Sequence, residues 1–187
     1  MNDGSNLIPL SENAGGASNA LALAESNKVM TEVIASLKIA KMFPRSEADA
    51  RDKILKDCTR PVLADVAIYE YKRGGTAITG PSIRLAEVMK RAWGNIDSGW
   101  REIERRPGES TLQAFAWDKE TNVRAVRDFV VKQVRVTAIW KEGKNTGQKK
   151  ITPLEDERDI YENNANQAAR RVRACILELI PGDIVDE

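Results

Sequence analysis

The sequence contains no histidine, and its 187 residues include only two cysteines. Without histidine the chain cannot form a Ser-His-Asp triad, a Cys-His nucleophile or a histidine-ligated zinc site. Two thiols are too few for an all-cysteine zinc site, and no Gly-x-x-x-x-Gly-Lys-Ser/Thr sequence is present to bind a nucleotide. Much of the common catalytic repertoire is therefore missing. This favours a binding protein over an enzyme, with no metal and no other cofactor expected.

Long apolar runs are absent as well. No stretch approaches the length of a membrane-spanning helix, and the N-terminus lacks the basic-then-apolar pattern of a signal peptide. We therefore expect a cytoplasmic protein. Cys58 and Cys175 both fall on apolar stripes of expected helices, which predicts buried free thiols rather than a disulfide.

Positive charge is concentrated in the middle of a chain whose net charge is only +1. Residues 123–150 contain eight lysines and arginines against two acids, and residues 72–106 contain eight against four. The acids lie mostly in the N-terminal helices, around Glu155 and at the C-terminus. Such an asymmetry indicates an anionic partner for the central part of the chain.

The hydrophobic pattern predicts an α+β fold. Residues 1–20 are rich in Asn, Gly and Ser without periodicity, so we expect a flexible N-terminal tail followed by a single domain over residues 21–187. The chain ends directly after Ile184-Val185, and we expect a further C-terminal region beyond residue 187. The expected helices cover residues 21–42, a segment capped at Ser46 that stops before Pro61, residues 83–93, and a long C-terminal helix over residues 155–180.

Two groups of strands lie between these helices. Residues 67–72 and 76–79 predict a β-hairpin around the Gly74-Gly75 turn. Residues 95–106, 111–117 and 123–140 predict a three-stranded antiparallel meander, backed by the long helix. Residues 141–153, which contain four lysines and two glycines, are expected to form a mobile basic loop.

Amides and guanidinium groups share one side of the long helix: Asn163, Asn166, Gln167, Arg170 and Arg171, with Arg173 close by. Such groups suit phosphates and the edges of bases, or carboxylates on another chain. The alternative is a solvated face with ion pairs inside the subunit.

One face of the meander should be covered by helices and the other free. On its third strand, Arg127, Phe129 and Arg135 alternate with Asp128, Val130 and Lys132, and because neither set is purely apolar, the sequence leaves open which face is free. The basic candidates for contact with a nucleic acid are Lys72, Arg73, Arg84, Lys90, Arg101, Arg105, Arg127, Lys132, Arg135, Lys149, Lys150, Arg170, Arg171 and Arg173. Trp93, Trp100, Trp117 and Trp140 are candidate stacking platforms for unpaired bases, with packing in the sheet as the alternative.

A second interpretation is a metal-dependent nuclease. Asp65, Glu70 and Lys72 give the spacing Asp-x-x-x-x-Glu-x-Lys, and Glu70 and Lys72 would point to the same side of a strand. Asp65, however, precedes Glu70 on what the pattern indicates is the same strand, whereas metal ligands usually converge from separate elements.

The order of elements resembles the core of phage single-strand annealing proteins, the RecT/Redβ-like superfamily. The segment Gly80-Pro81-Ser82-Ile83-Arg84-Leu85-Ala86 is similar in placement to the glycine-led helix that precedes the meander in that family. Ala114-Phe115-Ala116-Trp117 resembles its second strand, which combines small and aromatic residues. The resemblance covers about residues 29–180.

This resemblance implies ATP-independent binding of single-stranded DNA and annealing of complementary strands in phage-type recombination, by an oligomeric ring or filament. The partners would be single-stranded DNA, the annealed duplex intermediate and further copies of the chain, with a phage exonuclease or a host single-strand-binding protein as further candidates. The location would be the host cytoplasm. The remaining alternative is a non-enzymatic assembly protein whose basic surface meets acidic protein partners.

Overall fold

The computed structural model describes residues 12–73, 76–141 and 144–187, and their side chains except those of residues 12–18, 72, 73, 140, 141, 144 and 145. The chain divides into two compact units, one ending at Phe43 and the other extending from Pro44 to Glu187.

The first unit contains a single long helix, α1 (Glu12–Met42). It begins nine residues before the expected start at residue 21, so residues 12–20 are helical rather than part of a tail. Residues 1–11, the rest of the expected tail, lie outside the described residues. The helix ends just before Phe43-Pro44, where proline disfavours helical geometry in the preceding residue.

The second unit has the α+β architecture that the sequence predicts. Its elements are α2 (Glu47–Cys58), α3 (Pro61–Ala67), β1 (Ile68–Arg73), β2 (Thr76–Pro81), α4 (Ile83–Trp93), β3 (Ile96–Arg106), β4 (Glu109–Asp118), β5 (Val123–Lys132), β6 (Val134–Lys141), β7 (Lys144–Pro153), α5 (Glu157–Glu178) and α6 (Gly182–Asp186). β3, β4 and β5 form the expected antiparallel meander, and β1 and β2 the expected hairpin. The turn at Gly74-Gly75 lies outside the described residues.

Side-chain caps fix the starts of three helices. The Ser46 hydroxyl accepts a hydrogen bond from the Asp49 N–H at 3.3 Å, and the Ser82 hydroxyl accepts one from the Leu85 N–H at 3.2 Å. The Asp156 carboxylate accepts hydrogen bonds from the N–H groups at positions 158 and 159. Each cap satisfies backbone donors that have no partner within the helix.

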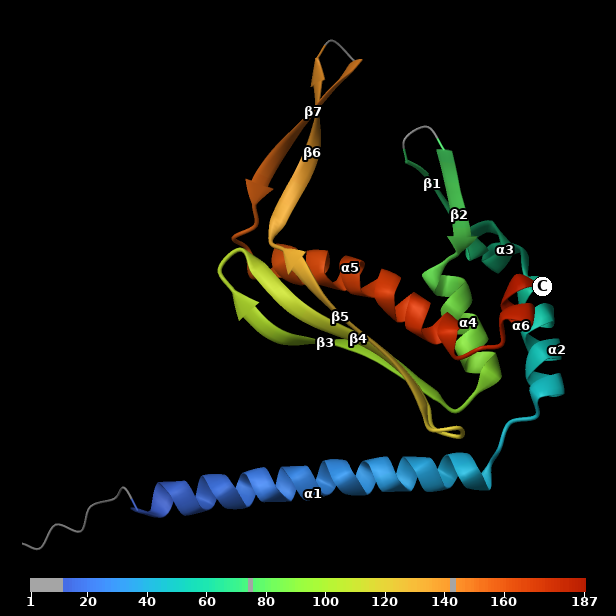
Figure 1. The fold of residues 1–187 in the computed structure, drawn as a ribbon, viewed down its shortest axis with the longest axis vertical. Helices are drawn as coiled ribbons and strands as arrows, with labels where there is room; N and C mark the ends of the chain where they lie inside the picture. Colours follow the sequence, from blue (N-terminus) through green and yellow to red (C-terminus); the bar gives the residue numbers. More distant parts are fainter. Residues whose placement is uncertain (1–11, 74–75, 142–143) are drawn as a thin grey trace, which may run out of the picture. The chain divides into compact units, whose positions relative to one another are not determined.

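The core lies between α5 and one face of the meander (Figure 1). Leu112, Ala114 and Ala116 alternate along β4 toward this side and are fully buried. Because alanine side chains are short, the helix packs close to the strand, and the Cys175 thiol lies 3.9 Å from the Ala114 carbonyl oxygen. Ile176 of α5 joins the same cluster, to which α2 and α4 contribute Ile54 and Met89. Both cysteines are free, Cys175 buried and Cys58 half-buried.

The third strand of the meander ends earlier than expected. β5 stops at Lys132, and β6 then pairs with β7 in a separate hairpin, so the expectation of a mobile loop over residues 141–153 is wrong for residues 144–153. Gln133 causes the break. Its backbone N–H donates to the Gly108 carbonyl at 2.8 Å, while its buried side chain accepts from the Gly108 N–H and donates to the Ser110 hydroxyl. These bonds hold Gln133 to the β3–β4 turn and separate the two strands.

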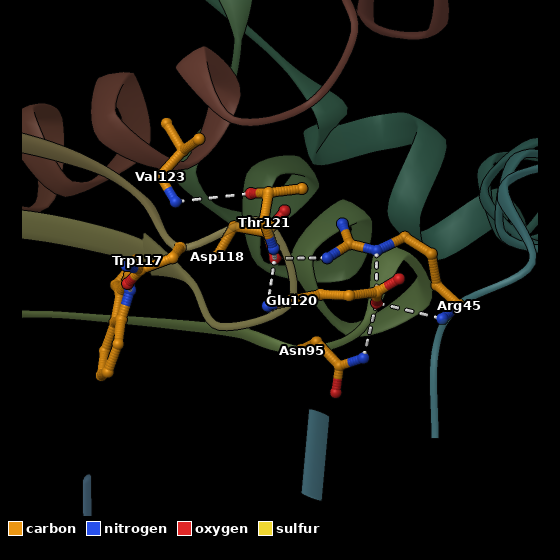
Figure 2. Close-up of polar contacts among 8 residues, drawn as sticks. Arg45, Asn95, Trp117, Asp118, Glu120, Thr121 and Val123 are labelled. Atoms are coloured by element: carbon orange, nitrogen blue, oxygen red, sulfur yellow. Dashed lines mark hydrogen bonds and ion pairs between the residues drawn. The ribbon is translucent and has the colours of Figure 1, made fainter. Parts of the chain in front are cut away.

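A buried ion-pair cluster holds the start of the second unit against the β4–β5 turn (Figure 2). The Arg45 guanidinium donates to Asp118 and, at 3.0 Å, to Glu120, whose carboxylate also accepts from the Arg45 backbone N–H and from Asn95. The side chains of Arg45 and Asp118 are only 7% and 4% exposed. The guanidinium also lies 5.3 Å from the centre of the Trp93 ring. Each charge in this cluster is compensated by a partner inside the same unit.

We expect Arg45→Met to destabilise the second unit by about 3 kcal/mol, because it leaves the Asp118 carboxylate buried without its cation. Urea unfolding at neutral pH measures the change. The matched control is Arg51→Met, which removes an exposed ion pair with Glu187 and should cost less than about 1 kcal/mol. Equal losses in the two variants would contradict the structural role of the buried pair.

Acid should weaken the folded state through Glu102 and Glu120. Burial by itself raises the pKa of Glu120, but the hydrogen bonds from Arg45 and Asn95 outweigh it and hold this pKa below its ordinary value. The hydrogen bond from Arg105 lowers the pKa of Glu102. Groups with a lowered folded-state pKa contribute stability that is complete above the unfolded-state pKa, about 4.3 for glutamate, and is lost as the pH falls through the folded value.

The free energy of unfolding, measured in urea, should therefore fall between about pH 5 and pH 3. Glu120→Gln should be less stable at neutral pH and show a shallower decline over this range, since it removes one of the two carboxylates whose pKa is lowered. A decline identical to that of the parent would show that Glu120 does not contribute.

Candidate nucleic-acid interface

Three of the basic candidates are neutralised inside the second unit. Arg105 donates to Glu102 at 2.7 Å and also contacts Glu157, and this raises the pKa of Arg105 above its ordinary value. The other two pairs are Arg127 with Glu178 and Arg135 with Asp159, each at 2.9 Å. A guanidinium that is paired with a carboxylate loses the energy of that ion pair when it binds a phosphate instead. These three are therefore weaker candidates for DNA contact than arginines that have no acidic partner.

The other described candidates have no carboxylate within 4.0 Å among the described side chains: Arg84, Lys90, Arg101, Lys132, Lys149, Lys150, Arg170, Arg171 and Arg173. Lys149 and Lys150 are exposed on β7. The side chains of Lys72 and Arg73 lie outside the described residues. The unpaired cations are thus spread over several elements, and α5 carries three of them.

Two of the three α5 arginines line an open groove beside β1. The groove has a volume of about 590 Å³ and is lined by Tyr69, Glu70 and Tyr71 of the strand and by Arg170 and Arg173 of the helix. The two tyrosine rings stack with their centres 6.0 Å apart, and the Arg173 guanidinium lies 4.3 Å from the centre of the Tyr69 ring. Aromatic faces and guanidinium groups are thereby brought to one surface.

Three residues of the polar side of α5 that the sequence analysis selected, Asn163, Gln167 and Arg171, make contacts within the second unit. Arg171 donates to both the backbone and the side-chain oxygens of Gln167, and its guanidinium lies 4.5 Å from the centre of the Phe129 ring. Asn163 donates to the Lys132 carbonyl and so ties α5 to the end of β5. The strip expected from the sequence therefore separates into a structural part and an open part around Arg170 and Arg173.

A ridge of α5 leads from this groove toward a second cleft. Tyr161, Ala165, Ala169 and Arg173 follow at steps of four residues and so lie on one side of the helix. Ala165, Ala169 and Trp100 line a cleft of about 230 Å³ between α4, α5 and β3. The Trp100 and Tyr161 rings are 5.8 Å apart at its side. From Tyr161 to Arg173 the ridge is about 18 Å long, which is comparable to five stacked nucleotides of one strand at about 3.4 Å each.

The three tryptophans whose side chains are described occupy different environments. Trp93 is 3% exposed in the core, so its ring cannot serve as a stacking platform and the packing alternative holds. Trp117 is buried beneath Arg124, whose guanidinium lies 4.0 Å from the ring centre. Trp100 is half-buried beside Tyr161, and the side chain of Trp140 lies outside the described residues.

The aromatic residues of the groove are tyrosines, which the sequence analysis did not select. The signal was present in the Tyr69-x-Tyr71 spacing, which places both rings on the same side of β1.

The residues of the nuclease interpretation lie on two elements, Asp65 on α3 and both Glu70 and Lys72 on β1. Asp65 is exposed on α3, so it does not share a strand with Glu70 as expected, and Glu70 lines the groove with the two arginines. The Lys72 side chain is not described. Among the side chains that are described, no group of three or more Asp, Glu, Cys or His residues is placed to hold a metal ion.

No family model, no curated protein and no solved structure matches this chain. The described helices include none with the length and apolar character needed to cross a membrane. The geometry of the groove is therefore the basis for the functional argument.

Gly80 leaves room for the Tyr69 ring, which lines the groove. It is the cross-strand partner of Tyr69, and a Cβ atom added at Gly80 would lie 2.8 Å from the Tyr69 hydroxyl and 3.0 Å from the ring. Gly80→Ala should therefore displace the Tyr69 ring and disturb its stacking on Tyr71. The aromatic proton chemical shifts of the two tyrosines report this change.

The control for this variant is Gly182→Ala, since a Cβ atom at Gly182 has no neighbouring atom within 4 Å. It should leave the shifts of Tyr69 and Tyr71 unchanged. Unchanged shifts in Gly80→Ala would show that the ring does not rest on the glycine.

Proposed function

We propose that the protein binds single-stranded DNA in the groove between β1 and α5 and anneals complementary strands without ATP. One observation carries the proposal: Arg170 and Arg173, which have no acidic partner among the described side chains, line the same groove as the stacked Tyr69–Tyr71 pair. Guanidinium groups neutralise phosphates and release counterions, while aromatic rings stack on bases irrespective of sequence. Both components of non-specific single-strand binding are therefore present on one surface.

The charge balance of the groove supports an anionic ligand. Glu70 is the acid among its described lining residues, against the two arginines Arg170 and Arg173. The Arg173 guanidinium lies 4.3 Å from the centre of the Tyr69 ring, a cation–π contact on the wall of the groove. A phosphate that enters meets these two cations without first displacing a carboxylate from them.

Annealing requires that a bound strand still presents its bases to a second strand. The groove is open to solvent, so a backbone held by the arginines leaves part of each base accessible. The reaction itself needs no nucleophile, metal ion or nucleotide, because it makes and breaks no covalent bond. This chemistry is compatible with a chain that lacks histidine and a P-loop sequence.

The proposed working form is a homo-oligomer, a ring or a filament. The α5 ridge is comparable in length to about five stacked nucleotides, whereas strand pairing has to continue over longer segments. Several copies are therefore needed along one strand. A phage exonuclease that supplies the strand, or a host single-strand-binding protein, would be a further partner in this proposal.

Arg170→Ala combined with Arg173→Ala should weaken binding of a single-stranded oligonucleotide by at least tenfold. The slope of log K against log salt should also decrease by about 1.4, since each lost phosphate contact on a single strand contributes about 0.7. Fluorescence anisotropy over a salt series measures both quantities. Annealing of two complementary labelled oligonucleotides should slow in parallel.

The matched control is Lys53→Ala with Lys56→Ala, which removes the same charge from exposed positions on α2. It should leave the salt slope unchanged. A salt slope unchanged in the arginine variant, or magnesium-dependent cleavage of the oligonucleotide by the parent protein, would count against the proposal.

A further inference from the structure

The cleft between α4, α5 and β3 differs in charge from the groove beside β1. Its described lining includes one cation, Lys90, and one acid, Glu87, so the two charges balance. The groove instead has two arginines against Glu70. A phosphate is attracted by net positive charge and therefore favours the groove. The cleft suits an uncharged group.

The walls of the cleft are apolar and aromatic. Ile83 of α4, Trp100 of β3 and Val172 of α5 line it together. Sites for small ligands are typically built from such walls with a few polar groups among them. Aromatic and apolar side chains are also the surfaces on which the faces of unpaired bases stack. The walls of the cleft therefore suit the two flat faces of a nucleobase.

The polar groups of the cleft can bind the edge of a base. The Lys90 ammonium donates a hydrogen bond to the Ser98 hydroxyl at 2.9 Å, and both residues line the cleft with Glu87. Neither Lys90 nor Glu87 has an oppositely charged partner within 4.0 Å among the described side chains. An ammonium group donates, a carboxylate accepts and a hydroxyl does both. The base edges of DNA likewise present both donors and acceptors, so the two sets can be matched.

The size of the cleft limits its occupant to a single base. Its volume is about 230 Å³, and a cavity of about 150 Å³ holds one benzene ring. One base therefore fits, whereas two stacked bases do not. Ala165 and Ala169 line the cleft with a single methyl group each. A longer side chain at either position would take up the space.

The cleft and the groove adjoin each other along α5. Ala169 lines the cleft and Arg173 lines the groove, one helical turn apart on the same side of the helix. Four residues of helix span about 6 Å, which is about two steps between stacked nucleotides at about 3.4 Å each. A strand with a phosphate at Arg173 therefore brings a neighbouring base close to the cleft.

We propose that the cleft accepts one unpaired base of the strand that lies in the groove. This inference rests on the proposed function, to which it adds a site for the base beside the sites for the phosphates. A base that is paired in a duplex faces its complement and cannot enter the cleft. Phosphates are present in single strands and duplexes alike, so the groove arginines alone do not distinguish the two. The cleft supplies the preference for the single strand, and its base leaves when the complementary strand pairs with it.

Ala169→Leu tests the site by filling the cleft without changing the charge of the protein. The dissociation constant for a short single-stranded oligonucleotide should rise about fivefold or more, since the loss of one stacked base costs at least about 1 kcal/mol. The slope of log K against log salt should keep its parental value, because no phosphate contact is removed. Fluorescence anisotropy over a salt series measures both quantities.

An abasic oligonucleotide of the same length gives the decisive comparison, because it carries the phosphates without the bases. The parent and Ala169→Leu should bind this strand equally well, and they should also bind a duplex of the same length equally well. The matched control is Ala64→Leu, at an exposed position of α3 that is not among the described lining residues of the groove or the cleft. It should bind all three ligands like the parent.

Ala165→Leu fills the cleft from the preceding turn of α5 and should reproduce the pattern of Ala169→Leu. Parental binding of the normal strand by both variants would overturn the proposal. So would an equal loss in both variants for the normal strand, the abasic strand and the duplex, since the loss would not depend on a base. Failure of the proposed function is recognised separately, because the parent itself would then bind the normal and the abasic strands without salt dependence.

Discussion

The close packing of α5 on β4 determines where the other surfaces of the second unit can be. Ala114 and Ala116 are small enough to let Cys175 and Ile176 approach the strand, and the resulting contact is completely buried. With that side of the helix committed to the core, its polar side must face outward. Arg170 and Arg173 therefore line the groove beside β1. The apolar contacts of Cys175 and Ile176 hold the helix on the sheet, so these two arginines are not needed for that packing.

Electrostatic pairing separates cations that support the fold from cations that remain available. Arg45 is held by carboxylates more than 70 residues away in the sequence, and Arg105 by the nearby Glu102 and the distant Glu157. The groove arginines have no carboxylate partner among the described side chains. A cation already bound to a carboxylate gains little from a phosphate, because one interaction is exchanged for another. Although the net charge of the chain is only +1, the groove arginines can therefore bind an anionic ligand without losing an ion pair.

Local signals in the sequence predicted much of the fold. The cap at Ser46, the helix that begins after Ser82 and the pairing of β1 with β2 in a hairpin each depend on a few neighbouring residues, and all three are confirmed. The break at Gln133 was missed because its cause is tertiary: the side chain is bound by Gly108 of the β3–β4 turn and by Ser110 of β4. The partners of the arginines were missed for the same reason, since residues 51 positions apart form the pair between Arg127 and Glu178.

The junction at Gln133 makes the β6–β7 hairpin a separable part of the chain. The chain leaves the body of the second unit at Gln133 and returns to it at Leu154 (Figure 1), where the Leu154 N–H donates to the Gln133 carbonyl at 2.8 Å; at the base of the hairpin Arg135 also pairs with Asp159 of α5. The hairpin is thus inserted between β5 and α5, and its first and last residues, Val134 and Pro153, are paired. The length and composition of that insertion can thus change without altering the register of β3, β4 and β5, which leaves the hairpin free to evolve independently of the body that carries it.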